Sequence, residues 1–172
     1  MNVTNEKYQI SLDDIKVLKS VYDKGIENAG HDSNNIYNTR FSKDAYNLDK
    51  VKSETFFCDL NNTELLNVIK KYINVNNNEY ISNIHYINYK EGEGALPHVD
   101  YPASIKTFLI LLNDDFEGAD FYLENEHIPF SMGEILLFDS NLLHEVKPVT
   151  KGNREVLVVW MKWNNKNKKS LL

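Results

Sequence analysis

The sequence lacks several features that mark particular classes of protein. Its one cysteine, Cys58, cannot close a disulfide within the chain, which fits a reducing compartment. No apolar run approaches the roughly 20 residues that cross a membrane. The first residues also lack the apolar segment of a secretory signal. We therefore expect a soluble, cytoplasmic protein with no membrane partner.

Positive charge is also scarce. The chain carries 19 Lys and Arg against 25 Asp and Glu, which gives a net charge of −6 and a pI of about 5.4. Because a phosphate backbone is poorly attracted by such a field, we expect no nucleic-acid partner. The 172 residues suffice for one well-buried domain, which we expect to be a monomer or a weak homo-oligomer.

The first part of this single domain, residues 1–78, is interpreted as a helical and looped support region. Apolar residues recur at helical spacing over 11–25 and again over 62–73. Residues 30–50 are interpreted as a long irregular loop, which is either a functional lid or a disordered segment. The last residues, 164–172, are rich in Asn and Lys and are interpreted as a flexible tail.

The second part, residues 79–163, is rich in β-branched and aromatic residues arranged in short runs. Turn residues separate six such runs, at 80–89, 104–112, 119–123, 132–138, 142–149 and 154–163. Because no helical pattern intervenes, the runs predict an antiparallel sandwich or barrel with the helices packed outside. We therefore expect a mainly β protein with flanking helices.

Two histidines and an aspartate in this second part have the spacing of metal ligands. His98 and Asp100 are two positions apart, and alternate residues of an extended strand share a face at about 6.6 Å along the chain. His144 lies far along the sequence, but a closed sheet can return it beside the first two. Two imidazoles and one carboxylate, with open positions beside them, are the ligand set of non-haem Fe(II) oxygenases.

Arginine is rare in this chain, and one of its two arginines begins an apolar run. Arg154 lies ten residues after His144 in Arg-Glu-Val-Leu-Val-Val-Trp-Met. Strand alternation places it on one face, taken as interior, with Val156, Val158 and Trp160. A buried arginine is costly unless a fixed anion pairs with it, and its planar fork suits a carboxylate. The pattern predicts a metal centre with an anchor for an acid.

Each of these residues alone has an ordinary structural interpretation. A lone histidine is more often hydrogen-bonded in a core, and an arginine at a strand end often extends to water. His85 is a rival ligand, but no carboxylate accompanies it at fixed spacing, so we interpret it as a buried or flanking histidine. A non-catalytic, cupin-like metal-binding module stays open as an alternative, although such a module has no use for an inward arginine.

The same residues carry a resemblance to a known family. Residues 84–163 resemble the 2-oxoglutarate/Fe(II)-dependent dioxygenases, and most closely their prolyl 4-hydroxylase-like branch. The resembling segments follow in order at 89–100, 111–121, 132–138, 144–149 and 152–160. The resemblance implies a double-stranded β-helix, or jelly roll, with helices supporting one sheet.

The resemblance also implies cofactors and an activity. His98, Asp100 and His144 would bind Fe(II), and Arg154 would hold the 5-carboxylate of 2-oxoglutarate. With O₂ as the other cosubstrate, the enzyme would hydroxylate a C–H bond and release succinate and CO₂. Ascorbate dependence is a further family implication. A peptidyl proline is the first substrate expected, and a free amino acid or other small molecule is the alternative. A nucleic-acid demethylase of this superfamily would need a basic groove, which the acidic sequence does not suggest.

Further positions match the lining of the family's cosubstrate pocket, namely Tyr89, Thr107 and Trp160. The chain departs from many relatives at Ala119, where they have a second glycine, and at Leu111, where some have a tyrosine bound to the 5-carboxylate. Either Tyr89 and Thr107 suffice as polar partners of the acid, or the acid binds more weakly than in those relatives. We expect residues 100–103 and 30–50 to form the mouth of the site.

Overall fold

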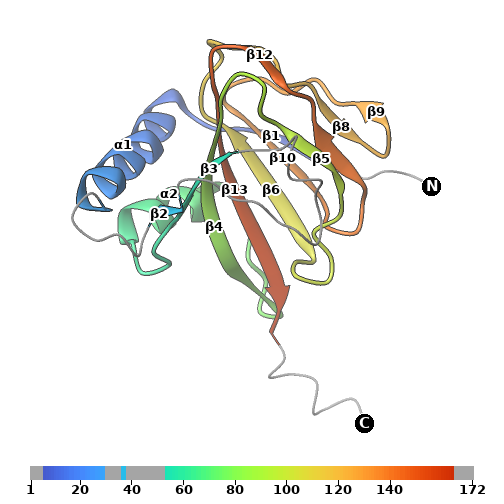
Figure 1. Ribbon diagram of the computed structural model, residues 1–172. Coiled ribbons are helices and arrows are strands. Elements are labelled where there is room, and N and C mark those ends of the chain that lie inside the picture. The colour runs from blue at the N-terminus through green and yellow to red at the C-terminus, as the bar shows by residue number, and fades with distance from the viewer. Residues whose placement is uncertain (1–5, 30–35, 38–52, 165–172) are drawn as a thin grey trace.

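The computed structural model describes residues 6–29, 36–37 and 53–164, which form two facing sheets with two helices on one side (Figure 1). The larger sheet has seven strands. In spatial order they are β1 (Glu6–Gln9), β10 (Glu134–Asp139), β6 (Lys106–Leu111), β13 (Arg154–Trp163), β4 (Glu79–Tyr89), β3 (Glu54–Phe57) and β2 (Ile36–Tyr37). All neighbouring pairs in it are antiparallel.

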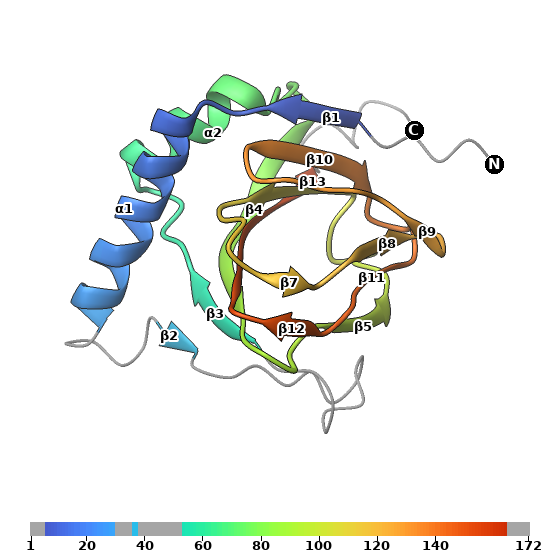
Figure 2. The same cartoon turned by 90° about the horizontal axis from the view of Figure 1, so that it is seen from above.

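The smaller sheet faces the larger one and has four antiparallel strands. They are β5 (Ala95–His98), β11 (His144–Val146), β8 (Phe121–Leu123) and β9 (Glu126–His127). A further antiparallel pair joins β7 (Glu117–Gly118) to β12 (Val149–Lys151) at one end of the sandwich (Figure 2). This arrangement is an antiparallel sandwich, as the strand pattern predicts, and it agrees with the jelly roll that the resemblance implies.

The helices α1 (Leu12–Ala29) and α2 (Thr63–Tyr72) cover the outer face of the larger sheet (Figure 2). Both begin at polar caps: Ser11 Oγ accepts from the Asp14 N–H, and the Asn62 side chain accepts from the Leu65 N–H. The two predicted helices are confirmed, and α1 continues four residues beyond its predicted end.

Two cores lie on opposite faces of the larger sheet. Leu157 and Val159 of β13 contact the apolar faces of the helices, in one cluster with residues such as Leu18 and Ile69. Val156 and Val158 belong to the second cluster, between the sheets, with residues such as Phe121. The predicted inward face of β13 is therefore confirmed, and the strand separates the core under the helices from the interior of the jelly roll.

The support region contributes strands as well as helices. β1 pairs with β10 at one edge of the larger sheet, and β3 pairs with β4 near the other, although we predicted no strand before residue 79. Of the predicted lid over 30–50, only Ile36 and Tyr37 lie within the described residues, and of the predicted tail only Asn164. No helix of the described part is long and apolar enough to cross a membrane.

Candidate metal centre

The three predicted ligands meet at one point between the ends of the sheets. His98 is the last residue of β5, His144 is the first residue of β11, and the two are paired across the smaller sheet. One nitrogen of each ring and one oxygen of Asp100 all lie within 4.8 Å of one another. The His98 and His144 ring centroids are 4.2 Å apart. The three residues singled out in the sequence therefore form one cluster of possible ligand atoms.

Asp100 reaches this cluster from a turn and not from the extended strand that we predicted. β5 ends at His98, and the backbone N–H groups of Asp100 and Tyr101 both donate to the Ser140 carbonyl at 2.9 Å. The Asp100 carbonyl in turn accepts from the Ser104 N–H at 3.0 Å. The carboxylate then lies 3.7 Å from His98 Nε2 and 3.6 Å from His144 Nε2. Backbone hydrogen bonds after the strand, more than strand alternation, fix the aspartate.

Both histidines present the same nitrogen to the cluster. His98 Nδ1 donates to the Leu96 carbonyl at 2.7 Å, and His144 Nδ1 donates to the Leu142 carbonyl at 3.0 Å. Because a carbonyl only accepts, each Nδ1 carries a proton, so Nε2 is the atom that each ring has left to offer a metal. Burial lowers the pKa of His144 to about 4. The nearby His98 lowers it as well, whereas the Asp100 carboxylate acts in the opposite direction. His144 is therefore neutral near pH 7, as a metal ligand must be.

Arg154 is fully buried at the first residue of β13, with 2% of its surface exposed. Its cross-strand partner on β4 is Tyr89, and the guanidinium carbon lies 5.7 Å from the Tyr89 ring centroid. Burial lowers the pKa of Arg154 to about 10, which still leaves it charged near neutral pH. Its Nη2 has no hydrogen-bond partner among the described residues. A buried cation with an unused donor is an anion site.

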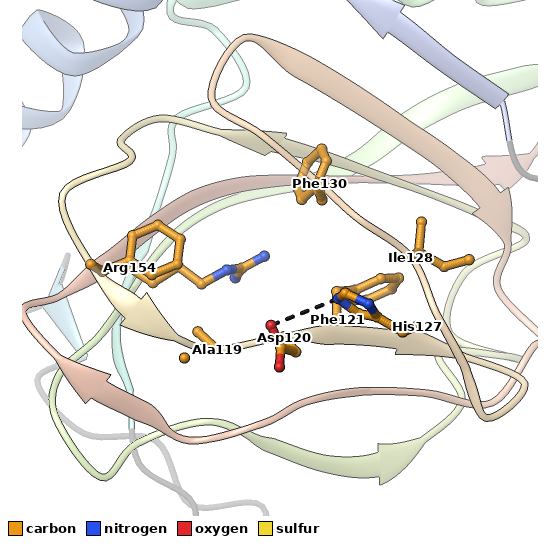
Figure 3. A pocket seen from close by; sticks show the side chains of 9 residues that line it. Ala119, Asp120, Phe121, His127, Ile128, Phe130 and Arg154 are labelled. Carbon is orange, nitrogen blue, oxygen red and sulfur yellow. Dashed lines mark ion pairs between the residues drawn. The ribbon is translucent and has the colours of Figure 1, made fainter.

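A pocket opens beside the guanidinium. Figure 3 shows Arg154 pointing into a space between the sheets, with about 300 Å³ of empty volume that is partly open to solvent. Aromatic residues, glycine and alanine form most of its lining: Phe116, Phe121, Phe130, Gly118 and Ala119. Asp120 and His127 also line it, with the Asp120 carboxylate 3.7 Å from His127 Nε2. These pocket residues were not predicted, since no sequence signal separates them from ordinary core positions.

The other predicted residues divide between two ends of one interior face. Tyr89 lies at the Arg154 end, whereas Thr107 and Trp160, which are cross-strand partners on β6 and β13, lie at the Asp100 end. Six strand positions separate Arg154 from Trp160, or roughly 20 Å of backbone. Arg154 lines the pocket described above, and none of the three clustered ligands does.

His85 behaves as interpreted from the sequence. It is buried on β4, its ring packs edge-on against Trp160 at 4.6 Å, and it is not among the three clustered ligands. Ala119, which replaces the second glycine of many relatives, adopts a φ of 56° directly after Gly118 at 75°. The turn therefore keeps the left-handed conformation that glycine favours, and the alanine methyl lies in the pocket lining.

These residues fit the cofactors implied by the resemblance. Two imidazole nitrogens and one carboxylate are ligands suited to a ferrous ion. The unused Arg154 donor fits the carboxylate of an acid, and the rigid guanidinium can form two parallel hydrogen bonds with it. Leu111, where some relatives have a tyrosine, is buried and pairs with Val156. Because its side chain has no polar atom, it offers the acid no hydrogen bond.

Comparisons with known proteins agree with this chemistry. A model of the 2OG-Fe(II) oxygenase superfamily matches residues 84–162. A PKHD-type hydroxylase of Prochlorococcus marinus is 35% identical over 75 residues, 37% of this chain and 34% of that relative. A PKHD-type hydroxylase of Idiomarina loihiensis is 39% identical over 51 residues, 27% of this chain and 23% of that relative. The matched part thus spans about a third or less of these curated relatives.

Solved structures extend the likeness of fold to nearly the whole chain. A viral collagen prolyl hydroxylase from Paramecium bursaria Chlorella virus-1 gives a TM-score of 0.63 at 16% identity, covering 91% of this chain and 94% of that one. A Pseudomonas putida prolyl-4-hydroxylase gives 0.66 at 13% identity, with 94% of each chain covered. A Trichoplax adhaerens prolyl hydroxylase gives a TM-score of 0.66 at 18% identity, covering 99% of this chain and 89% of that one.

The segment matched by the superfamily model contains all three clustered ligands and the buried arginine, and it forms most of the two facing sheets. The resemblance to prolyl 4-hydroxylase-like proteins is confirmed by the named relatives and the shared fold. Residues 84–162, a little under half of the chain, are therefore similar to the 2OG-Fe(II) oxygenase superfamily.

Proposed function

We propose that this protein is an Fe(II)- and 2-oxoglutarate-dependent dioxygenase that hydroxylates a C–H bond, most readily on a peptidyl proline. His98, Asp100 and His144 would hold the iron, and Arg154 would bind the 5-carboxylate of 2-oxoglutarate with Tyr89 packed beside it. The observation that carries the proposal is a three-ligand cluster together with a buried guanidinium, Arg154, whose Nη2 has no hydrogen-bond partner among the described residues.

The bound iron would supply the oxidation, in which 2-oxoglutarate and O₂ become succinate and CO₂ as the substrate is hydroxylated. The chain itself would bind and orient the reactants. The charged guanidinium of Arg154 would fix the far end of the diacid, and the apolar residues between the sheets would exclude water from it. The fixed Nδ1–H groups of the two histidines keep their Nε2 atoms directed at the metal.

The alternative of a non-catalytic, cupin-like metal module is disfavoured by Arg154. Such a module would leave a fully buried cation without an anion, which is a costly arrangement to retain in a core. The choice of a proline substrate has support in the three similar structures compared above, each of which is a prolyl hydroxylase. A free amino acid or other small molecule stays the second candidate substrate. We further propose that the protein acts as a monomer or weak homo-oligomer in the cytoplasm, without a nucleic-acid partner, and that ascorbate sustains its turnover, as the resemblance implies.

The test is succinate release from 2-oxoglutarate in the presence of Fe(II), O₂ and a library of proline-containing peptides. We expect succinate formation together with a gain of one oxygen in a peptide, detected by mass spectrometry. The Asp100→Ala variant should lose both signals while keeping the wild-type circular dichroism spectrum. Succinate without any peptide product would favour a small-molecule substrate. Failure of the metallated protein to bind or turn over 2-oxoglutarate would overturn the proposal.

A further inference from the structure

The carboxylate of Asp100 is held by hydrogen bonds from two strands of the larger sheet. Thr107 Oγ1 on β6 donates to Asp100 Oδ2 at 2.7 Å, and Trp160 Nε1 on β13 donates to the same oxygen at 2.8 Å. Asp100 Oδ2 therefore accepts two side-chain hydrogen bonds, one from each strand. Oδ2 also lies 3.6 Å from His144 Nε2, whereas the other oxygen, Oδ1, receives neither of these hydrogen bonds and faces His98 Nε2 at 3.7 Å.

The direction of each hydrogen bond follows from the groups involved. An indole N–H only donates, and an ionised carboxylate only accepts. Thr107 Oγ1 also lies 2.9 Å from Ser140 Oγ. Because the one hydroxyl proton of Thr107 goes to Asp100, the proton between the two hydroxyls must come from Ser140. A directed chain therefore runs from Ser140 through Thr107 to the carboxylate, and Trp160 approaches the same oxygen separately.

The donors of this chain are themselves fixed. Thr107 and Trp160 are cross-strand partners in the middle of the larger sheet, so their separation is set by backbone pairing. Thr107 and Ser140 are buried, and the His85 ring packs edge-on against Trp160. The Ser140 carbonyl also accepts from the Asp100 N–H, so one residue holds both the backbone and, through Thr107, the side chain of the aspartate.

We propose that Trp160 and Thr107, supported by Ser140, are positioning residues that saturate Asp100 Oδ2 and thereby reserve Oδ1 for the metal. This inference rests on the proposed iron centre. It gives Trp160 and Thr107 a role distinct from the lining of the cosubstrate pocket expected from the resemblance. Partners of this kind orient a metal ligand, and their loss lowers metal affinity by about 10- to 100-fold.

The test is titration of the full chain with Co(II), a spectroscopically visible substitute for Fe(II), without cosubstrate or turnover. Trp160→Phe keeps an aromatic ring and removes the N–H, whereas Thr107→Val keeps the shape of the side chain and removes the hydroxyl. Trp163→Phe is the matched control, because Trp163 lies on the same strand and is 55% exposed. Circular dichroism and thermal unfolding establish that each variant folds.

We expect Trp160→Phe and Thr107→Val each to raise the Co(II) Kd by about 10- to 100-fold. Their visible d–d bands should also shift, since a carboxylate released at Oδ2 can change its mode of coordination. Trp163→Phe should match the wild type in both measurements. A merely structural role of the two residues would lower thermal stability without altering the spectrum of the bound metal.

Three results would overturn the inference. Unchanged Kd and spectrum in both variants, with the wild type binding Co(II), would remove the positioning role and leave the proposed iron centre intact. An equal loss in Trp163→Phe would show that the strand, not the hydrogen bond, matters. A wild-type protein that binds no Co(II) would overturn the proposed function and this inference with it.

Discussion

Arg154 joins two properties that seldom occur in one side chain, complete burial and an unused hydrogen-bond donor. If the 5-carboxylate binds there, Arg154→Ala leaves a desolvated carboxylate without its partner, which costs roughly 3–5 kcal/mol. We expect the KM for 2-oxoglutarate to rise by about two to three orders of magnitude. Arg154→Lys, which keeps the charge but loses the planar fork, should show an intermediate rise. Succinate release over a range of cosubstrate concentrations gives both values, and an unchanged KM would refute the assigned role.

At the same scale, the residues that the sequence predicted best are those whose chemistry is unusual for their surroundings. A charged arginine in an apolar run and an H-x-D triplet both stand out without any structure, and the structure buries the first and brings the second together with His144. Ser140 could not be found in this way, because a serine after a strand has many ordinary uses. Its contact with Thr107 depends on sheet pairing between residues that are 33 positions apart.

At the scale of elements, the strands missed by the sequence analysis are those without an apolar pattern. All four residues of β1 are exposed, and the strand joins β10 through backbone pairing and an ion pair between Lys7 and Glu134 at 3.4 Å. Periodicity reports which side chains are buried, so it cannot detect a strand that buries none. β13 is the opposite case. Its two faces serve two different cores, and its alternation was therefore predicted correctly.

The turn before β13 contains a glycine whose replacement should lower the stability of the protein. Gly152 has a φ of +76°, and an added Cβ would lie 2.7 Å from the Asp115 carbonyl oxygen, which is backbone and cannot rotate away. Gly92 has a similar φ of +79° but open space around it. We expect Gly92→Ala to lower the free energy of unfolding by about 1–2 kcal/mol, the cost of the left-handed conformation alone. Gly152→Ala should cost at least about 1 kcal/mol more.

Urea denaturation of the two glycine variants measures this difference directly. Because Gly152 lies two residues before Arg154, the Gly152→Ala variant should also bind 2-oxoglutarate more weakly, whereas Gly92→Ala should bind it like the wild type. Equal losses of stability in the two variants would mean that the contact with Asp115 has no energetic consequence.

The contact between α1 and α2 has its own dependence on pH. The Asp14 carboxylate of α1 accepts hydrogen bonds from Lys71 and Tyr72 of α2 and from Ser11. These hydrogen bonds hold the pKa of Asp14 below its usual value, and the one from Lys71 has the largest effect. A lowered folded-state pKa stabilises the protein above the ordinary aspartate value of about 4, and this stability is lost as the pH falls through the folded pKa.

Asp14→Asn should therefore lower the free energy of unfolding by about 1 kcal/mol at pH 7, a value that allows for solvent screening of the exposed Lys71 ammonium. The difference from the wild type should shrink as the pH falls below about 4. Asp13→Asn is the control, because Asp13 lies in the same helical turn with its side chain 91% exposed. Chemical unfolding of both variants across this pH range measures the effect, and a difference that persists at low pH would contradict it.

At the scale of the whole molecule, the site exists because two sheets meet face to face. The smaller sheet contributes the two histidines, the larger sheet contributes Arg154 and the donors to Asp100, and a turn between β5 and β6 contributes Asp100 itself. The jelly roll could be predicted from the strand-rich half and the resemblance. Which predicted residues lie at which end could not, since that depends on the register of β6 against β13.

A ligand that binds only the folded molecule raises its stability by mass action, so the two ends of the site can be probed through unfolding. At 100 times its Kd, a ligand contributes about 2.7 kcal/mol, or about 5–10 °C in Tm for a chain of this size. We expect Mn(II), a redox-inactive substitute for Fe(II), to raise the Tm of the wild type, and 2-oxoglutarate to raise it further. Asp100→Ala should lose the Mn(II) shift. Arg154→Ala should keep the Mn(II) shift and lose most of the additional one from 2-oxoglutarate, because only the far end of the diacid has lost its partner. A full 2-oxoglutarate shift in Arg154→Ala would mean that the acid binds somewhere other than beside this buried guanidinium.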